Sequence, residues 1–282
     1  MKKILFIFVC FYFQSASAQT LINREEVVTR HNIHITKADS LSSLTVGNGE
    51  FAFTVDVTGL QSFPEYYAKG VPLGTESEWG WHSFPNTNRY RFDETLKVYD
   101  LEEKKIPYPV QIKEPERNKE AVEYFRVNPH RLQLGNIGLE IKLKDGSLAT
   151  INDVKNVNQQ LDLWTGVINS SFTVEDVPVK VITVCHQQQD AIAFKIESPL
   201  LKEKRINIRI RFPYPTGEFK DAGDNWSNED KHQSLLSAGI HNAIIKRILD
   251  STIYYTDISW ASSVSIVEHS KHYFLLQPSG KE

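Results

Sequence analysis

Short segments in which apolar and polar residues alternate recur along most of the chain. In residues 51–57 every second side chain from Phe51 to Val57 is apolar, which is typical of a half-buried strand. Comparable strand-like segments are residues 139–143, 172–184, 192–197, 206–212, 253–260 and 264–267. Turn residues separate them, and no regular alternation of strands with helices is visible. The pattern predicts an all-β fold, a large antiparallel β-sandwich, and disfavours a doubly wound dinucleotide-binding fold.

Three further segments refine this prediction. Gly47-Asn48-Gly49 lies between two strand-like runs and is typical of a tight turn; a phosphate loop would need a glycine-rich run that opens a helix. Residues 243–249 fit either a helix face or a strand, and we favour the strand. Residues 102–123 are rich in Lys, Glu and Pro, so we expect a solvated excursion from the surface.

The first 18 residues have the layout of a secretory signal peptide. Lys2 and Lys3 precede an unbroken apolar run, Ile4 to Phe13, and small residues follow up to Ala18. A run of ten is too short for a membrane span, which needs about 20 residues. We therefore expect cleavage after Ala18, a single β-sandwich domain over residues 19–282, no membrane span, and export to the periplasm or the medium.

Composition narrows the classes of partner and cofactor. The formal charge of the chain is −3, and the signal segment contains two lysines and no acid, so the remainder carries −5. No basic excess favours nucleic acid as a partner. His31 and His34, like His269 and His272, are three apart, which sends the two rings to opposite faces of a strand. We expect no metal site and no cofactor, and no serine-nucleophile motif identifies a catalytic residue.

The most suggestive chemistry is an aromatic cluster with neighbouring acids and amides. Its candidate carbohydrate-binding residues are Glu76, Glu78, Trp79, Trp81, His82 and Asn86, and a second, weaker candidate is Trp226. Indole rings offer flat apolar faces to the C–H face of a sugar, while acids and amides hydrogen-bond its hydroxyls. Two alternatives stay open, namely that the tryptophans fill the core and that the acids are solvated loop residues.

Four segments carry a family resemblance. Residues 44–51 (LTVGNGEF) resemble a turn near the start of the N-terminal β-supersandwich domain of glycoside hydrolase family 65, in the six-hairpin glycosidase superfamily. Residues 161–168 (LDLWTGVI) resemble a strand of the same domain. Residues 131–139 and 211–215 are similar to a bacterial branch of this superfamily. The resemblance covers residues 24–277 and rests on strands and turns.

The resemblance implies an ancestry among carbohydrate enzymes, but it assigns no catalytic residue to this chain. In that family the catalytic groups lie in a helical (α/α)6 barrel that follows the β-domain, and the printed sequence ends at Glu282, where that barrel would begin. We therefore expect a carbohydrate-binding domain that is not catalytic alone and that associates with a helical domain or partner chain. The alternatives are an independently active glycoside hydrolase that uses acids such as Glu76 and Glu78, and a structural sandwich without a ligand.

Overall fold

The computed structural model describes residues 22–218, 222–261 and 263–279, and the expected signal peptide lies outside these residues. The strands are β1 (Ile33–Ile35), β2 (Leu44–Gly47), β3 (Phe51–Val55), β4 (Thr75–Ser77), β5 (Trp81–His82), β6 (Leu96–Leu101), β7 (Lys104–Pro109), β8 (His130–Arg131), β9 (Asn136–Ile141), β10 (Val154–Asp162), β11 (Val167–Val174), β12 (Val177–Cys185), β13 (Ile192–Glu197), β14 (Ile206–Arg211), β15 (His232–Ala238), β16 (Asn242–Leu249), β17 (Thr252–Ser259), β18 (Val264–Ser270) and β19 (Tyr273–Pro278). The helices are α1 (Arg24–Thr29), α2 (Pro64–Tyr67), α3 (Glu116–Val127) and α4 (Pro199–Lys202), with short 3-10 turns η1 (Phe92–Thr95), η2 (Ile151–Asp153) and η3 (Glu229–Lys231).

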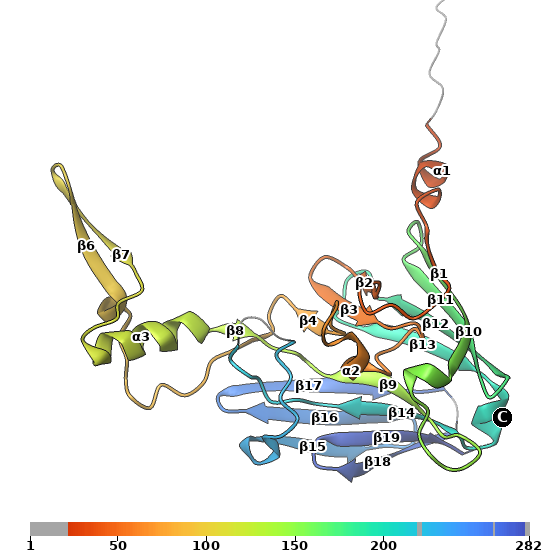
Figure 1. The fold of residues 1–282 in the computed structure, drawn as a ribbon. Coiled ribbons are helices and arrows are strands. Elements are labelled where there is room, and N and C mark those ends of the chain that lie inside the picture. The colour runs from red at the N-terminus through yellow and green to blue at the C-terminus, as the bar shows by residue number, and fades with distance from the viewer. Residues whose placement is uncertain (1–21, 219–221, 262, 280–282) are drawn as a thin grey trace, which may run out of the picture.

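The strands form stacked antiparallel sheets, so the predicted all-β sandwich is confirmed. One layer contains the five-stranded sheet β1-β10-β11-β12-β13 together with β2-β3-β4, and the other contains β18-β19-β14-β9 together with β15-β16-β17 (Figure 1). Their facing sides bury the alternate apolar residues that the sequence pattern singled out. Phe53, Ile168, Phe172, Ile206 and Phe274 are each at most 2% exposed. Burial of this apolar surface is the main stabilising contribution to the fold.

The predicted turn and the ambiguous segment both belong to this sandwich as expected. Gly47–Gly49 connects β2 to β3, and the Asn48 side chain accepts hydrogen bonds from the backbone N–H groups of Glu50 (3.0 Å) and Phe51 (2.8 Å). Gly49 has a φ of 98°, a conformation that glycine adopts without strain. Residues 242–249 form strand β16, paired on both sides, so the preference for a strand over a helix is confirmed.

A buried corner after β3 connects the two layers. Asp56 is fully buried and accepts hydrogen bonds from the Thr58 N–H (2.8 Å), the Thr58 hydroxyl (2.5 Å) and the Phe63 N–H (2.8 Å). Desolvation raises the pKa of Asp56 to about 6 in spite of these donors. The corner leads to Gln61, whose amide nitrogen donates to the Gly74 carbonyl (2.9 Å) beside β4. The corner therefore fixes the position of β4.

The strand β9 completes this arrangement, because its backbone and that of the corner lie unusually close together. The Gln61 N–H donates to the Ile137 carbonyl over 2.7 Å, and the Ile137 N–H donates back to the Gln61 side chain over 3.0 Å. A Cβ atom at Gly138 would lie only 2.4 Å from the Gln61 carbonyl oxygen. Glycine is thus required at position 138 for the corner to reach β9.

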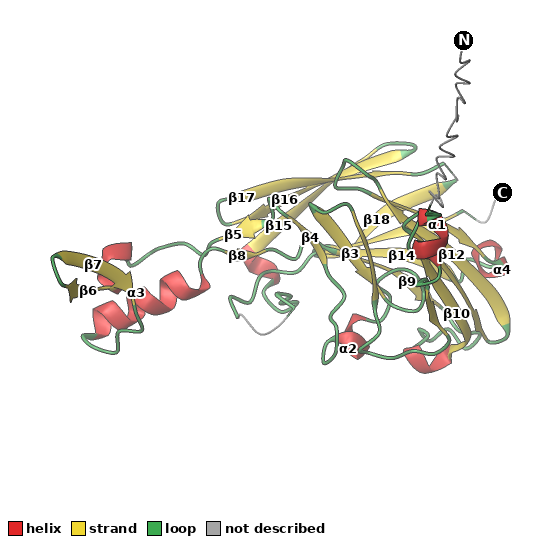
Figure 2. Cartoon of the chain, turned by 90° about the horizontal axis from the view of Figure 1, so that it is seen from above, coloured by secondary structure: helices red, strands yellow, loops and turns green. Residues whose placement is uncertain are grey.

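Residues 86–128 form an arm that projects from one end of the sandwich (Figures 1 and 2). The arm contains η1, the β6–β7 hairpin and α3, and almost all side chains of the hairpin are exposed. The expected excursion over residues 102–123 is thus exposed, but it is regularly structured, and its polar composition did not indicate the twelve-residue helix α3. Among the described residues, no helix has the length and apolar character that crossing a bilayer requires.

Candidate functional site

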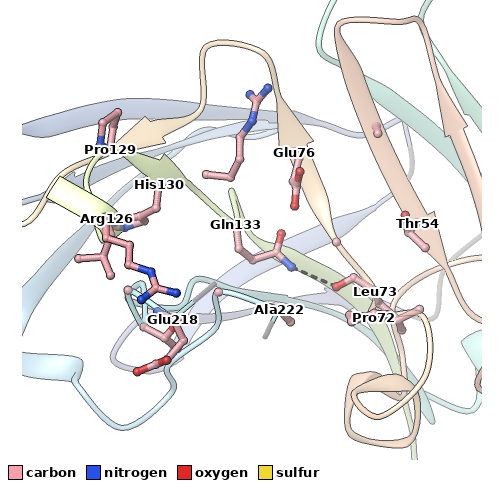
Figure 3. Close-up of a pocket in the computed structure, with 17 residues that line it drawn as sticks. Thr54, Pro72, Leu73, Glu76, Arg126, Pro129, His130, Gln133, Glu218 and Ala222 are labelled. Carbon is pink, nitrogen blue, oxygen red and sulfur yellow. Dashed lines mark hydrogen bonds between the residues drawn. The ribbon is translucent and has the colours of Figure 1, made fainter. Parts of the chain in front are cut away.

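A cavity of about 530 Å³ opens where the arm joins the sandwich. Strands β3 and β4, the end of α3, β8 and the loop after β14 surround it (Figure 3). Its polar and charged lining comprises Thr54, Glu76, Arg126, His130, Arg131, Gln133, Thr216 and Glu218. Two carboxylates, two guanidinium groups and an amide therefore border one space, which suits a ligand with several hydrogen-bonding groups.

Glu76 reaches the cavity because of the alternation within β4. Thr75 and Ser77 are buried on one face of this strand, so Glu76 projects from the other face, where it is exposed. Figure 3 shows Glu76 extending into the cavity opposite Gln133. Gln133 is itself fixed, because it accepts from the Thr75 N–H (2.7 Å) and donates to the Leu73 carbonyl (3.0 Å). Glu78 lies beyond the strand, exposed, and is not part of the described lining.

Trp79 is held firmly although its side chain is 48% exposed. Its indole N–H donates to the Asp190 carboxylate over 2.6 Å, and the Ser77 hydroxyl donates to the same oxygen over 2.5 Å. The ring also lies against Tyr254, with the centroids 5.8 Å apart. An oriented indole thus keeps nearly half of its surface in solvent.

Trp81 is 45% exposed and borders the cavity through its partner across the β5–β8 pair, Arg131. The guanidinium carbon of Arg131 lies 4.2 Å from the centroid of the Trp81 ring, a cation–π contact. The same guanidinium donates to the carbonyls of Ser77 (2.9 Å) and Glu78 (3.1 Å). These bonds tie the Trp81 ring, the cavity wall and the end of β4 into one unit.

The other three candidate residues have their polar atoms engaged within the protein. His82 is 1% exposed, and its ring nitrogens contact Asp250 (2.9 Å) and His130 (3.0 Å), so no nitrogen is left for a ligand. Asn86 closes a turn at the base of the arm through two hydrogen bonds with the Tyr90 backbone. Trp226 donates to Asp224 over 3.0 Å and lies under the guanidinium of Arg211, away from the described lining of the cavity.

The structure therefore brings Glu76, and Trp81 through Arg131, together with groups that the sequence pattern did not identify, whereas Trp79 lies against Asp190 and Tyr254. Arg131, Gln133 and Glu218 lie 55, 57 and 142 residues after Glu76 in the chain. Polar residues at 131 and 133 that flank the buried Leu132 are the one local signal that was present. Among the described residues, no group of three or more His, Cys, Asp or Glu side chains is arranged to hold a metal ion.

Comparisons with known proteins concern the fold alone. No protein-family model matches the chain, and no curated protein matches its sequence. Among solved structures, the chain is similar to a protein described as a kojibiose phosphorylase from the human microbiome, with 10% sequence identity and a TM-score of 0.49. The likeness covers 87% of this chain and 29% of that protein, so the chain spans less than a third of the length of this neighbour.

Proposed function

We propose that the chain is an exported β-sandwich domain that binds carbohydrate beside the cavity, with Trp79 and Trp81 as apolar platforms and Glu76 as a hydroxyl partner. The observation that carries this proposal is the exposure of the two tryptophans, 48% and 45%. Tryptophans that merely filled the core would be buried. Here each ring is oriented by a specific contact and still offers a face to solvent, as an apolar platform for a sugar requires.

The polar groups around the cavity supply the other half of sugar recognition. Glu76 accepts hydrogen bonds, whereas Arg131 donates them, and both border the space next to the Trp81 ring. A pyranose that stacks on the indole would present its hydroxyl rim to these two groups. The sequence resemblance to glycoside hydrolase family 65 supports the same class of ligand. We further propose that the domain acts together with a helical domain or partner chain and does not catalyse a reaction alone.

The test is a glycan array probed with residues 19–282, followed by calorimetric titration of the best-binding oligosaccharide. We expect Trp81→Ala and Trp79→Ala each to weaken binding about fivefold, because an aromatic stacking contact contributes on the order of 1 kcal/mol. Trp164→Ala is the matched control, since Trp164 is equally exposed at 48% but lies in the turn between β10 and β11. Binding of no glycan, or equal losses in all three variants, would refute the proposal.

A second candidate function, glycoside hydrolysis by the domain itself, is favoured by one observation: Glu76 and Glu218 line the same cavity. Hydrolysis requires two carboxyl groups on either side of the scissile bond, about 5 to 9 Å apart. Turnover of a chromogenic glycoside that is lost in both Glu76→Gln and Glu218→Gln would establish this function, and Glu78→Gln serves as the control. Absence of turnover across a broad panel of glycosides would exclude it.

Export is tested separately. Expression in a bacterial host with an intact secretion system should release a protein whose N-terminal residue is Gln19. An intact N-terminus in the cytoplasm would contradict the expected signal peptide, without bearing on carbohydrate binding.

A further inference from the structure

A line of three hydrogen bonds runs from Asp250, in the turn between β16 and β17, through the buried His82 to the base of the arm. Asp250 contacts His82 Nε2 through Oδ2 (2.9 Å), and His82 Nδ1 contacts His130 Nε2 (3.0 Å). His130 Nδ1 then contacts the carbonyl oxygen of Val127 (2.8 Å), the last residue of α3. We refer to Asp250, His82 and His130 as the histidine relay.

The number of protons in the relay follows from the chemistry of its two ends. A backbone carbonyl only accepts hydrogen bonds, and an ionised carboxylate also only accepts. Three hydrogen bonds between these ends therefore need three protons on the two imidazole rings. Two neutral imidazoles supply only two. The complete relay thus contains one imidazolium.

The surroundings indicate which ring carries the extra proton. The Tyr214 hydroxyl donates to the same Asp250 oxygen over 2.7 Å, and burial together with this bond raises the pKa of Tyr214, so the phenol stays protonated. This Asp250 oxygen therefore accepts a hydrogen bond from the phenol. Burial lowers the pKa of His82, which disfavours a positive charge on the inner ring. The charge then falls on His130, which is half-buried and lines the cavity.

We propose that this proton operates a pH-sensitive latch between the arm and the sandwich. While His130 is an imidazolium, its Nδ1–H holds the Val127 carbonyl and its Nε2–H holds His82. Loss of the proton leaves one pair of acceptors facing each other. Because His82 is only 1% exposed, breaking either of its two contacts would leave a buried ring nitrogen without a partner, so the contact of the half-buried His130 with Val127 is the one that opens. The latch is thus closed at low pH and open at high pH, whether or not the cavity binds a sugar.

Other contacts at the base of the arm involve no proton exchange, so the opening is local. The Phe84 N–H donates to the Asn128 side chain (2.7 Å), and the Tyr124 hydroxyl donates to the Phe84 carbonyl (3.0 Å). These bonds keep the arm attached at any pH. Deprotonation should loosen residues 127–130, which form one wall of the cavity, and leave the arm in place.

The charged and titratable groups around the relay come from several elements. On the inner side they are Tyr214, Lys231 and His232, and on the cavity side they are Glu76, Arg126, Arg131 and Glu218. Burial lowers the pKa of His232 to about 3, so this ring stays neutral. The pH response is therefore assigned to the relay and not to its histidine neighbour.

Hydrogen–deuterium exchange of the protein, with rates corrected for the intrinsic effect of pH, tests the latch. In the wild type we expect exchange in peptides that cover residues 121–130 to rise about tenfold between pH 5 and pH 9, the effect of losing one charge-assisted hydrogen bond. Asp250→Asn separates the latch from a merely structural role. The carboxamide N–H supplies the third proton, so the relay is complete with two neutral rings. This variant should exchange slowly at both pH values.

His269→Gln, which changes an exposed histidine in β18, is the matched control and should keep the wild-type profile. A wild-type profile that does not change with pH would overturn the proposal, and so would an Asp250→Asn variant that exchanges faster at both pH values. Nitrogen-15 NMR of histidine-labelled wild type gives a readout without mutation. At pH 5 we expect three protons on the ring nitrogens of His82 and His130, whereas two protons would contradict the latch.

Discussion

The buried carboxyl group of Asp56 should give this protein an unusual dependence of stability on pH. Its pKa is raised to about 6 in the folded chain, against an ordinary value of 3.8, because burial disfavours the charged form. The folded chain therefore binds a proton that the unfolded chain releases between these two values. This contribution to the free energy of unfolding is fully present below pH 3.8 and is lost as the pH rises to about 6.

The size of the effect follows from the interval between the two values. At about 1.4 kcal/mol per pH unit, the step from 3.8 to about 6 corresponds to about 3 kcal/mol. Integrated over the titration, about 2.5 kcal/mol of this falls between about pH 4 and pH 7.5. Asp56→Asn removes the titration, but its NH2 group would face the Phe63 N–H, two donors in contact. This mismatch adds a cost of about 1 to 3 kcal/mol that does not depend on pH.

Urea unfolding of wild type and Asp56→Asn from pH 4 to pH 7.5 measures both the contribution that depends on pH and the constant cost of the mismatch. The variant should be less stable than the wild type at pH 4, and the difference should shrink by about 2.5 kcal/mol by about pH 7.5. Asp145→Asn is the control. Asp145 is exposed, and hydrogen bonds from Ser147 lower its pKa, so its difference should not shrink with rising pH. A difference for Asp56 that stays constant or grows with pH would refute the reasoning.

Two other substitutions test how the cavity wall is supported. Gly138→Ala should lower the free energy of unfolding in urea by about 3 kcal/mol or more, because the added Cβ atom would lie 2.4 Å from the Gln61 carbonyl oxygen. Gly74→Ala is the control: the atoms nearest to its added Cβ would be 3.9 Å away, so stability should change little. Gln133→Ala removes the hydrogen bonds to Thr75 and Leu73 that fix β4, so calorimetry should record a loss of stability of about 1 to 3 kcal/mol together with weaker glycan binding. Unchanged glycan affinity in this variant would show that the hydrogen bonds of Gln133 to β4 are not needed to position Glu76 for glycan binding.

The local sequence pattern was sufficient to predict the sandwich, because each strand or hairpin is specified by residues that are close together in the chain. Alternation in residues 51–57 and the Gly-Asn-Gly turn specify the β2–β3 hairpin without help from the rest of the chain. The same holds for β16, whose apolar residues fit between β15 and β17. The arm helix α3 was missed because only Ala121 among its twelve residues is buried, so its sequence shows no apolar face.

The arrangement of the candidate site could not be predicted in the same way, because it depends on contacts between residues that are far apart in the chain. Trp79 is oriented by Asp190, 111 residues away, and His82 is buried against Asp250, 168 residues away. The pairing of β5 with β8 brings Arg131 onto Trp81 across the whole length of the arm. The aromatic composition marked this edge of the sandwich as a candidate, but the tertiary pairing decided that Trp81 is exposed and His82 is not.

A crystal structure of the protein soaked with the best-binding oligosaccharide from the glycan array tests the central claim most directly. We expect a sugar ring stacked on the indole of Trp79 or Trp81, with hydroxyl groups within hydrogen-bonding distance of Glu76 or Arg131. A sugar bound elsewhere on the sandwich or on the arm, with both indole faces still in solvent, would contradict it.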